Sequence, residues 1–236
     1  NMQKKQPAAY DPQAESFAGF ATGSFSWKAV ERPLFDLQLR DYFNLDTKVL
    51  DAGCGSGRIS AYLIEKGISA KNIVGVDISK KLLELAHRHV PGVKFVREDL
   101  RDLRLDSTFN LITAHMVLES LDGLGLKDTF KNFFNLLEKN GALFFIDTHP
   151  LRTNSYDSGD FHTERWVTAP TPWGHQNTVF HRTAEGYTNA LVQAGFKIDA
   201  VDDLQVPQET RSLDEKEYER YANKGPIRLA IKAHKK

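Results

Sequence analysis

The sequence is poor in three features that would each point to a particular class of protein. It has one cysteine, Cys54, so it forms no internal disulfide, and this usage favours a reducing cytoplasm. No apolar run approaches the ~20 residues that a membrane-spanning helix needs, and we do not expect the polar residues at the start to act as a secretory signal. The 31 basic side chains balance the 31 acidic ones, which gives no global attraction for nucleic acid or an anionic membrane.

What remains is the composition of an ordinary globular protein. Apolar residues make up 41% and charged residues 26% of the 236 positions, enough for one α/β domain with a full core. We expect residues 1–44 to form an N-terminal helical segment, which acts as a lid or packs on the sheet, with a mobile linker over 19–27. Residues 45–236 are expected to form the main domain.

Apolar runs alternate with amphipathic segments after residue 45. The runs predict strands at 48–51, 73–77, 93–96, 109–114, 142–146, 196–201 and 227–233. The amphipathic segments predict helices at 59–66, 80–90, 127–137, 183–194 and 213–223. Ser79 is expected to cap the second of these helices, and Gly195 to end the fourth. Strands that alternate with helices indicate βαβ units and a parallel sheet.

Residues 148–182 interrupt this alternation. The stretch contains prolines, interleaved aromatic residues and four histidines, namely His149, His162, His175 and His181. An aromatic insertion after the end of a strand is where a substrate-covering loop is expected. The spacing of these histidines does not resemble that of metal-ligand pairs, so we predict no metal site.

The stretch that follows the first predicted strand carries an acid and three glycines at alternate positions. Asp51 precedes Gly53, Gly55 and Gly57, and the next residue is Arg58. The dinucleotide-binding pattern requires a small residue where Arg58 stands, and the phosphate-loop ending Gly-Lys-Ser/Thr is absent. An alternate-glycine loop next to a carboxylate instead suits a ligand with a cationic amine and no phosphate. This disfavours a dinucleotide-dependent oxidoreductase.

Two further acids end the next two predicted strands. Asp77 is placed to accept the hydroxyls of a ribose. Asp99 is placed to accept a hydrogen bond from an adenine amino group, while the backbone of Leu100 contacts the adjacent ring nitrogen. Either acid alone is equally consistent with a helix cap or a surface carboxylate. Because parallel strands end at one edge of the sheet, the acids and the glycine loop together predict a site for an adenosyl cofactor.

These motifs resemble the successive motifs of the class I S-adenosylmethionine-dependent methyltransferases. The resemblance implies a three-layer, doubly wound α/β fold. Its seven-stranded, mostly parallel sheet has a reversed last strand, which we assign to 227–233. The motifs are VLDAGCGSG at 49–57, VGVDIS at 74–79, REDL at 97–100, FNLI at 109–112, LLEKNGAL at 136–143 and LVQAGF at 191–196.

The resemblance also implies a role for each matching residue. Asp51, Gly53, Gly55 and Gly57 hold the methionine part, and Cys54 lies among them as a small filler. The ribose is assigned to Asp77 with Ile78, the adenine to Asp99 with Leu100, and the methyl face to residues 114–117, including His115. Tyr10, Phe17 and Arg58 are further candidates for closing over the cofactor.

Methyl transfer from a sulfonium is an in-line displacement that leaves S-adenosylhomocysteine, and the protein mainly supplies alignment and desolvation. A base is needed only when the acceptor must lose a proton. The candidate bases are His181, His149 and His115, each with a packing or surface histidine as the alternative, and Glu119 is a further candidate.

The aromatic insertion suits a small-molecule acceptor that is methylated on oxygen or nitrogen. Ala-His-Met-Val after the fourth predicted strand lacks the Asn/Asp-Pro-Pro-aromatic motif, which argues against amino-methylation of DNA bases. An RNA or protein methyltransferase stays open as an alternative, as does a non-catalytic S-adenosylmethionine-binding protein. Nucleic-acid and membrane partners are not expected, and the sequence does not predict an oligomeric state.

Overall fold

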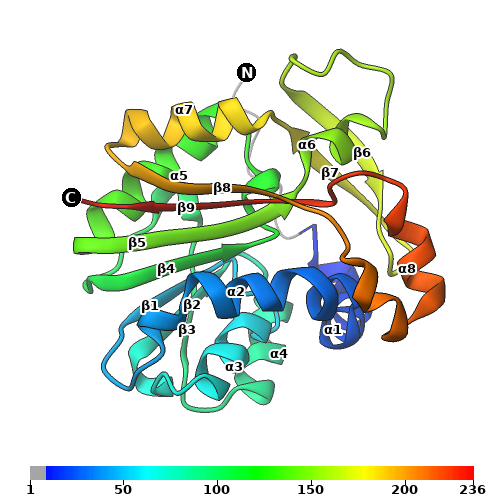
Figure 1. The fold of residues 1–236 in the computed structure, drawn as a ribbon. Coiled ribbons are helices and arrows are strands. Elements are labelled where there is room, and N and C mark those ends of the chain that lie inside the picture. The colour runs from blue at the N-terminus through cyan, green and yellow to red at the C-terminus, as the bar shows by residue number, and fades with distance from the viewer. Residues whose placement is uncertain (1–8) are drawn as a thin grey trace.

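The computed structural model describes residues 9–236, so residues 1–8 of the expected N-terminal segment lie outside the described part. Its centre is a seven-stranded sheet with the order β3-β2-β1-β4-β5-β9-β8 (Figure 1). The strands are β1 Val49–Ala52, β2 Ile73–Asp77, β3 Lys94–Arg97, β4 Phe109–His115, β5 Leu137–Thr148, β8 Lys197–Leu204 and β9 Arg228–His234. Strand β9 pairs antiparallel with both β5 and β8, which confirms the predicted reversed last strand.

Helices cover both faces of the sheet and complete the three predicted layers (Figure 1). Helices α2 Arg32–Gln38, α3 Arg58–Glu65 and α4 Lys80–His89 lie on one face, and α5 Gly123–Leu136 and α7 Ala184–Ala194 on the other. Side chains alternate along each strand, so Val49 and Leu111 enter one core while Leu50 and Ile112 enter the other. In the described part of the chain no helix is long and apolar enough to cross a membrane.

Local capping signals explain where several helices begin and end. The Ser79 hydroxyl accepts from Leu82 N and starts α4, and Gly195, at φ 101°, ends α7, both as predicted. Helix α5 begins four residues before its predicted start because the Asp122 side chain caps it.

Strand β5 also begins earlier than predicted. The Lys-Asn-Gly stretch at 139–141, whose asparagine and glycine are typical of turns, lies inside the strand. Asn140 has φ 61° there, and the register to β4 shifts between Phe109 and Leu111. Residues that are typical of a turn therefore form a β-bulge in this structure.

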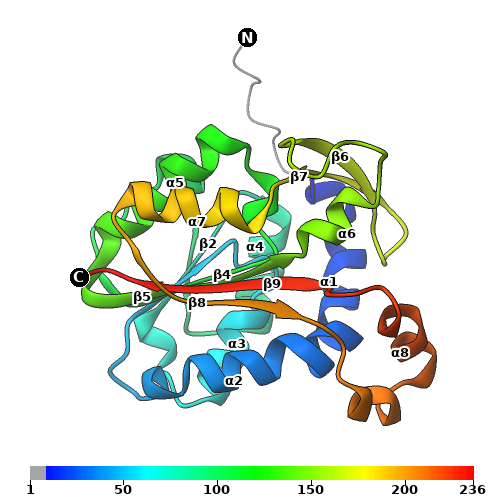
Figure 2. The same cartoon turned by 45° about the horizontal axis from the view of Figure 1, so that its top comes forward.

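Residues 148–182 are not an irregular loop, which corrects the prediction. They contain the short helix α6 Pro150–Asn154 and an antiparallel hairpin of β6 Arg165–Pro170 and β7 Gln176–His181. Val167, Ala169 and Val179 pack together as a small separate core, which stabilises the hairpin. Figure 2 shows it beyond the C-terminal ends of β4 and β5, beside helix α1 Ala14–Gly23.

Most of the stretch 19–27, expected as a linker between two helices, is itself helical. Helix α1 runs through Gly23, and Trp27–Glu31 forms a π-helical turn that leads into α2. The physical reason is packing, because Ala14 and Ala18 of α1 lie against Leu82 and Leu85 of α4. At the other end of the chain, α8 Glu215–Ala222 is anchored by stacking of Tyr221 on Phe25.

Candidate functional site

The glycine loop, defined here as residues 53–57, joins β1 to α3 at the C-terminal edge of the sheet. The N–H groups of Gly53 and Cys54 both donate to Val76 O, at 2.7 and 2.9 Å, which ties the loop to β2. Gly53 has φ 70°, and a Cβ there would lie 2.4 Å from a methyl carbon of Val117. Only glycine tolerates both this backbone angle and so close an approach of the chain after β4.

Asp51 lies beneath the glycine loop and is buried. Its side chain accepts a hydrogen bond from Ser60 Oγ at 2.6 Å, and the residue is 1% exposed. Burial raises the pKa of Asp51 to about 6. The carboxyl that was expected to hold the methionine part joins the end of β1 to α3 in this structure.

Asp77 ends β2 and faces the glycine loop directly. Its Oδ2 accepts from Gly55 N at 2.9 Å and its Oδ1 from Ser79 N at 2.8 Å. The residue is half-buried, and burial raises its pKa. The backbone of Ile78 also donates to this carboxylate. A carboxylate offers about four acceptor positions, so it can still accept from a ribose hydroxyl. Ile78, the other expected ribose contact, follows it and accepts from Arg97 Nε through its carbonyl.

Asp99 is at the end of β3, as predicted, but it forms an ion pair. Its carboxylate accepts from Arg101 Nε at 2.9 Å and from Arg101 Nη2 at 2.7 Å, and it caps the short turn Leu100–Asp102. Leu100 is buried, and its carbonyl accepts from Asn132 Nδ2. The structure thus places both expected adenine contacts at the same sheet edge as Asp77.

His115 lies in a buried charge network that the sequence did not reveal. Arg58 Nη2 is 2.9 Å from His115 Nδ1, and His115 Nε2 is 3.0 Å from Glu31 Oε2. Glu31 Oε1 accepts from Arg228 Nε at 2.6 Å. Because a guanidinium only donates, we assign the ring proton to Nε2, which donates to Glu31.

Burial and the neighbouring charges determine the protonation states of His115 and Glu31. Burial and the nearby Arg58 lower the pKa of His115 to about 4, so the ring is neutral at pH 7. Burial opposes ionisation of Glu31, but Arg228 and His115 hold its pKa well below the usual range. His115 thereby links Arg58 to Glu31, and neither ring nitrogen is left for a proton acceptor role.

The other two candidate histidines also use both ring nitrogens. His149 accepts from Leu151 N through Nδ1, which caps α6, and its Nε2 is 2.9 Å from Asp203 Oδ1. His181 is fully buried, with Nδ1 2.7 Å from Thr153 Oγ1 and Nε2 2.8 Å from the Phe161 carbonyl. Both ring nitrogens of each histidine therefore have partners within the described part of the chain, as the packing alternative for these residues expects.

Aromatic and amide side chains cover the glycine loop and form what we call the roof: Tyr10, Gln13, Phe17, Trp173 and Asn177. The Phe17 ring would lie 3.3 Å from a Cβ on Gly55, and its centroid is 5.1 Å from that of Trp173. Trp173 Nε1 donates to Gln13 Oε1 at 2.6 Å, and Gln13 Nε2 donates to Asn177 Oδ1 at 2.8 Å. The N-terminal segment and the hairpin are thus held together above the loop.

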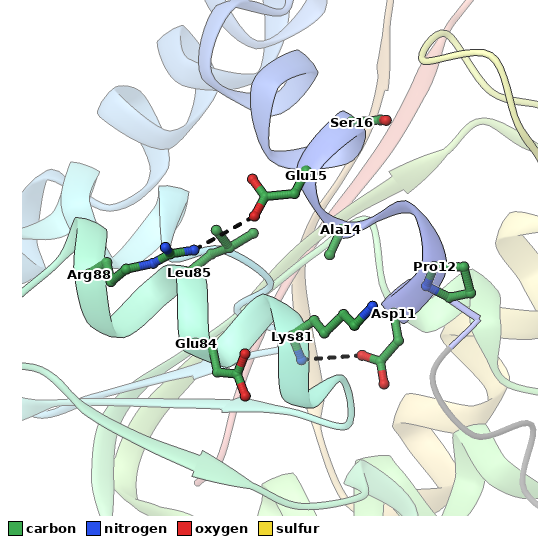
Figure 3. Close-up of a pocket in the computed structure, with 9 residues that line it drawn as sticks. All are labelled: Asp11, Pro12, Ala14, Glu15, Ser16, Lys81, Glu84, Leu85 and Arg88. Carbon is green, nitrogen blue, oxygen red and sulfur yellow. Dashed lines mark hydrogen bonds and ion pairs between the residues drawn. The ribbon is translucent and has the colours of Figure 1, made fainter.

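The N-terminal segment is also anchored beside Asp77. Asp11 accepts from Ser79 Oγ at 2.5 Å and from Lys81 N at 3.2 Å, so it binds the first turn of α4. A cavity of about 290 Å³ opens next to this contact, where Figure 3 shows Glu15 reaching toward Arg88. Its lining residues come from the N-terminal segment and from α4, and none of them belongs to the glycine loop.

Part of this chain matches a known protein family. Residues 49–141 match the family described as "Methyltransferase domain". The matched range runs from the first residue of β1 into β5, so it includes the glycine loop, Asp77 and Asp99.

Curated relatives are similar to less than half of this chain. The putative methyltransferase YqeM of Bacillus subtilis is 33% identical over 110 residues, which are 43% of this chain and 42% of the relative. A trans-aconitate 2-methyltransferase of an Enterobacter species is 33% identical over 113 residues, 48% of this chain and 43% of the relative. The matches thus span less than half the length of these relatives.

Solved structures extend the similarity to nearly the whole fold. An S-adenosylmethionine-dependent methyltransferase from Mesorhizobium loti superposes with a TM-score of 0.70 at 21% identity. The superposition covers 91% of this chain and 99% of that one. The chain therefore has the Rossmann-like methyltransferase fold, as predicted.

Proposed function

We propose that the protein transfers a methyl group from S-adenosylmethionine to an oxygen or nitrogen atom of a small-molecule acceptor. The observation that carries this proposal is the junction of β1, the glycine loop and Asp77. There, Gly55 N and the Asp77 carboxylate are 2.9 Å apart at the C-terminal edge of a parallel sheet. This is the edge at which ligands bind in doubly wound folds.

The residues present fit an adenosyl cofactor. The glycine loop offers a backbone without side chains for the methionine part, at Gly53, Cys54, Gly55 and Gly57. Asp77 is half-buried and can accept from a hydroxyl in addition to its backbone donors, which suits a ribose. We assign the ribose to Asp77 with Ile78 and the adenine to Asp99 with Leu100.

Asp51 and the histidines support this site without facing it. The buried Asp51 fixes the start of α3 through Ser60, and His115 fixes the orientation of Arg58. When bound, the cofactor supplies an activated methyl group, so the protein's task is to align the acceptor and exclude water. We therefore propose structural roles for His149 and His181.

The roof side chains exclude water from the proposed site. Tyr10 and Phe17 belong to the expected 1–44 segment, and Trp173 and Asn177 to the 148–182 insertion. We propose that these two segments separate to admit ligands and close during transfer. Closure by aromatic side chains favours a small acceptor over a polymer, and the name of the trans-aconitate relative also indicates a small-molecule acceptor.

Calorimetric titration with S-adenosylhomocysteine tests the cofactor site. The parent protein should bind, and Asp77→Ala should lose at least about tenfold in affinity, because hydrogen bonds to a charged group contribute ~1.5–3 kcal/mol each. Asp128→Ala removes an exposed carboxylate on α5 and should bind like the parent. Absence of binding by the parent, or equal affinity of Asp77→Ala, would contradict the site.

A radiolabel experiment tests the reaction and the acceptor class. The protein is incubated with S-adenosylmethionine, labelled on its methyl group, and with a cell extract separated into small-molecule, RNA and protein fractions. Label should appear in the small-molecule fraction. Label in RNA or protein would contradict the acceptor class, and no transfer by a protein that binds S-adenosylhomocysteine would indicate a non-catalytic binding protein.

A further inference from the structure

Arg182 is a buried cation that this chain pairs only in part. It follows β7 directly and is 2% exposed. Its Nη2 donates to the Leu121 carbonyl at 2.8 Å, but its Nη1 has no hydrogen-bond partner among residues 9–236. The guanidinium carbon lies 4.9 Å from the ring centroids of both Phe180 and Tyr187, which flank it. A desolvated charge with an unpaired donor is costly, and such groups commonly serve a ligand or an ordered water.

The carboxylate nearest to Arg182 in the described part of the chain does not complete this pairing. Glu164 Oε1, from the segment before β6, is 3.6 Å from Arg182 Nε, which exceeds the length of a hydrogen bond. The Glu164 side chain is 39% exposed, so solvent screens this ion pair. A pair of this kind opens readily and lets another anion approach Arg182.

The first turns of α5 and α7 lie against the same carboxylate. A Cβ on Gly186 would be 2.5 Å from Glu164 Oε1, and a Cβ on Gly123 would be 3.4 Å from Glu164 Oε2. The two oxygens thus contact two helices at positions that carry no side chain. First-turn N–H groups lack intrahelical partners, and the helix dipole favours an anion beside them. We call Gly123, Gly186 and Arg182 the carboxylate seat.

A cavity of about 210 Å³ opens next to the carboxylate seat. Lys127 adds a second positive charge to its lining, and Asn189 and Gln193 add side-chain amides that can donate. None of the lining residues belongs to the glycine loop or the roof. They are the three seat residues with Glu164, Leu126, Lys127, Asn189, Ala190 and Gln193. The cavity therefore offers room for the body of a small molecule outside the proposed cofactor site.

We propose that the carboxylate seat is a second binding site, which takes the carboxylate of a small molecule in place of Glu164. A free carboxylate is not tied to the backbone, so it can approach Arg182 as a bidentate partner, which Glu164 does not do. The body of the ligand then occupies the cavity. Glu164 is an internal competitor that fills the seat when no ligand is bound. The inference does not depend on methyl transfer, since the seat shares no residue with the proposed cofactor site.

Succinate, a small dicarboxylate, tests the inference in amide-resolved NMR titrations at constant ionic strength. Its addition should shift the amide resonances of Gly123 and Gly186. Glu164→Ala empties the seat and should tighten the apparent binding of succinate at least about fivefold, because no internal carboxylate competes. Glu185→Ala, which removes an exposed carboxylate from the same first turn of α7, is the matched control. It should change the affinity by less than about twofold, because salt screens an exposed charge.

A second pair of variants tests the seat while leaving Arg182 in place. Gly123→Leu, made in the Glu164→Ala protein, fills the space that the carboxylate leaves and should weaken succinate at least about fivefold. Gly19→Leu in the same background adds the same side chain at a position of α1 with no neighbour within 4 Å, and should leave the affinity unchanged. The inference is overturned if Glu164→Ala binds succinate no more tightly than the parent, if Gly123→Leu has no effect, or if only resonances distant from the seat shift.

Discussion

Replacing Glu31 by glutamine is expected to destabilise the protein strongly. The Glu31 side chain is 1% exposed and joins the N-terminal segment to the ends of two strands, through His115 on β4 and Arg228 on β9. Glutamine has the same size but no charge. The variant would therefore keep Arg228 and Arg58 in the buried network beside a neutral His115, without the carboxylate that balances them.

The size of the effect follows from the burial of the pair. Removing one partner of a buried ion pair costs ~3–5 kcal/mol, because the other charge stays desolvated. Proteins of 150–250 residues lose ~2–4 °C in melting temperature per kcal/mol. Glu31→Gln should therefore lower the melting temperature by roughly 6–20 °C. Thermal unfolding followed by circular dichroism at pH 7 measures this difference.

A matched control and a pH series sharpen the test. Glu65→Gln breaks an ion pair of 2.5 Å to Arg32, but its side chain is 56% exposed, so the cost should stay below about 1 kcal/mol. The pKa of Glu31 is lower in the folded state than in the unfolded state. Its stabilisation is thus present above the unfolded pKa, near 4.5, and is lost as the pH falls toward the folded value. The reasoning is refuted if both variants melt alike at pH 7, or if the difference between Glu31→Gln and the parent grows on acidification.

Two further substitutions test the loop and the roof. Gly53→Ala and Gly67→Ala both place a side chain at positive φ, which costs ~1–2 kcal/mol, but only at Gly53 would the added Cβ meet a neighbour within 4 Å. Thermal unfolding should therefore show a further loss of ~1–3 kcal/mol for Gly53→Ala, and equal losses would contradict the close contact. Trp173→Phe removes the hydrogen bond to Gln13, worth ~1 kcal/mol, and should speed proteolytic cleavage of the N-terminal segment roughly fivefold. Trp166→Phe, on the other face of the hairpin, should not change this rate, and an unchanged rate for Trp173→Phe would show that the roof contact does not hold the segment.

Residues that act on their own sequence neighbourhood were sufficient to predict much of the arrangement of helices and strands. Ser79 and Gly195 act within one helical turn of their own positions, so the sequence around them is enough to place the helix ends. The same is true of Asp77, because a buried strand followed by an acid fixes the acid at the sheet edge. The fold class and the location of the expected cofactor contacts follow from such signals repeated along the chain.

Contacts between distant residues could not be predicted in this way. Glu31 meets His115 and Arg228 across 84 and 197 positions of sequence, and no pattern in one sequence links them. The same applies to the bond between Gln13 and Trp173, which turns two separate segments into one roof. The hydrogen-bond partners of His149 and His181 could not be predicted for the same reason, since they are set by tertiary packing.

The hairpin at 148–182 was missed for a different reason. Its strands have six residues each, and their inward-facing apolar side chains are few, so no period was evident among the prolines and aromatics. The pairing becomes favourable only when Val167 and Val179 pack together. Propensity alone therefore indicated a loop where packing forms a sheet.

The structure of the complex with S-adenosylhomocysteine tests the central claim most directly. The account predicts the homocysteine part along the backbone of residues 53–57, with both ribose hydroxyls hydrogen-bonded to the Asp77 carboxylate. A ligand bound elsewhere, or a ribose that makes no contact with Asp77, would contradict it.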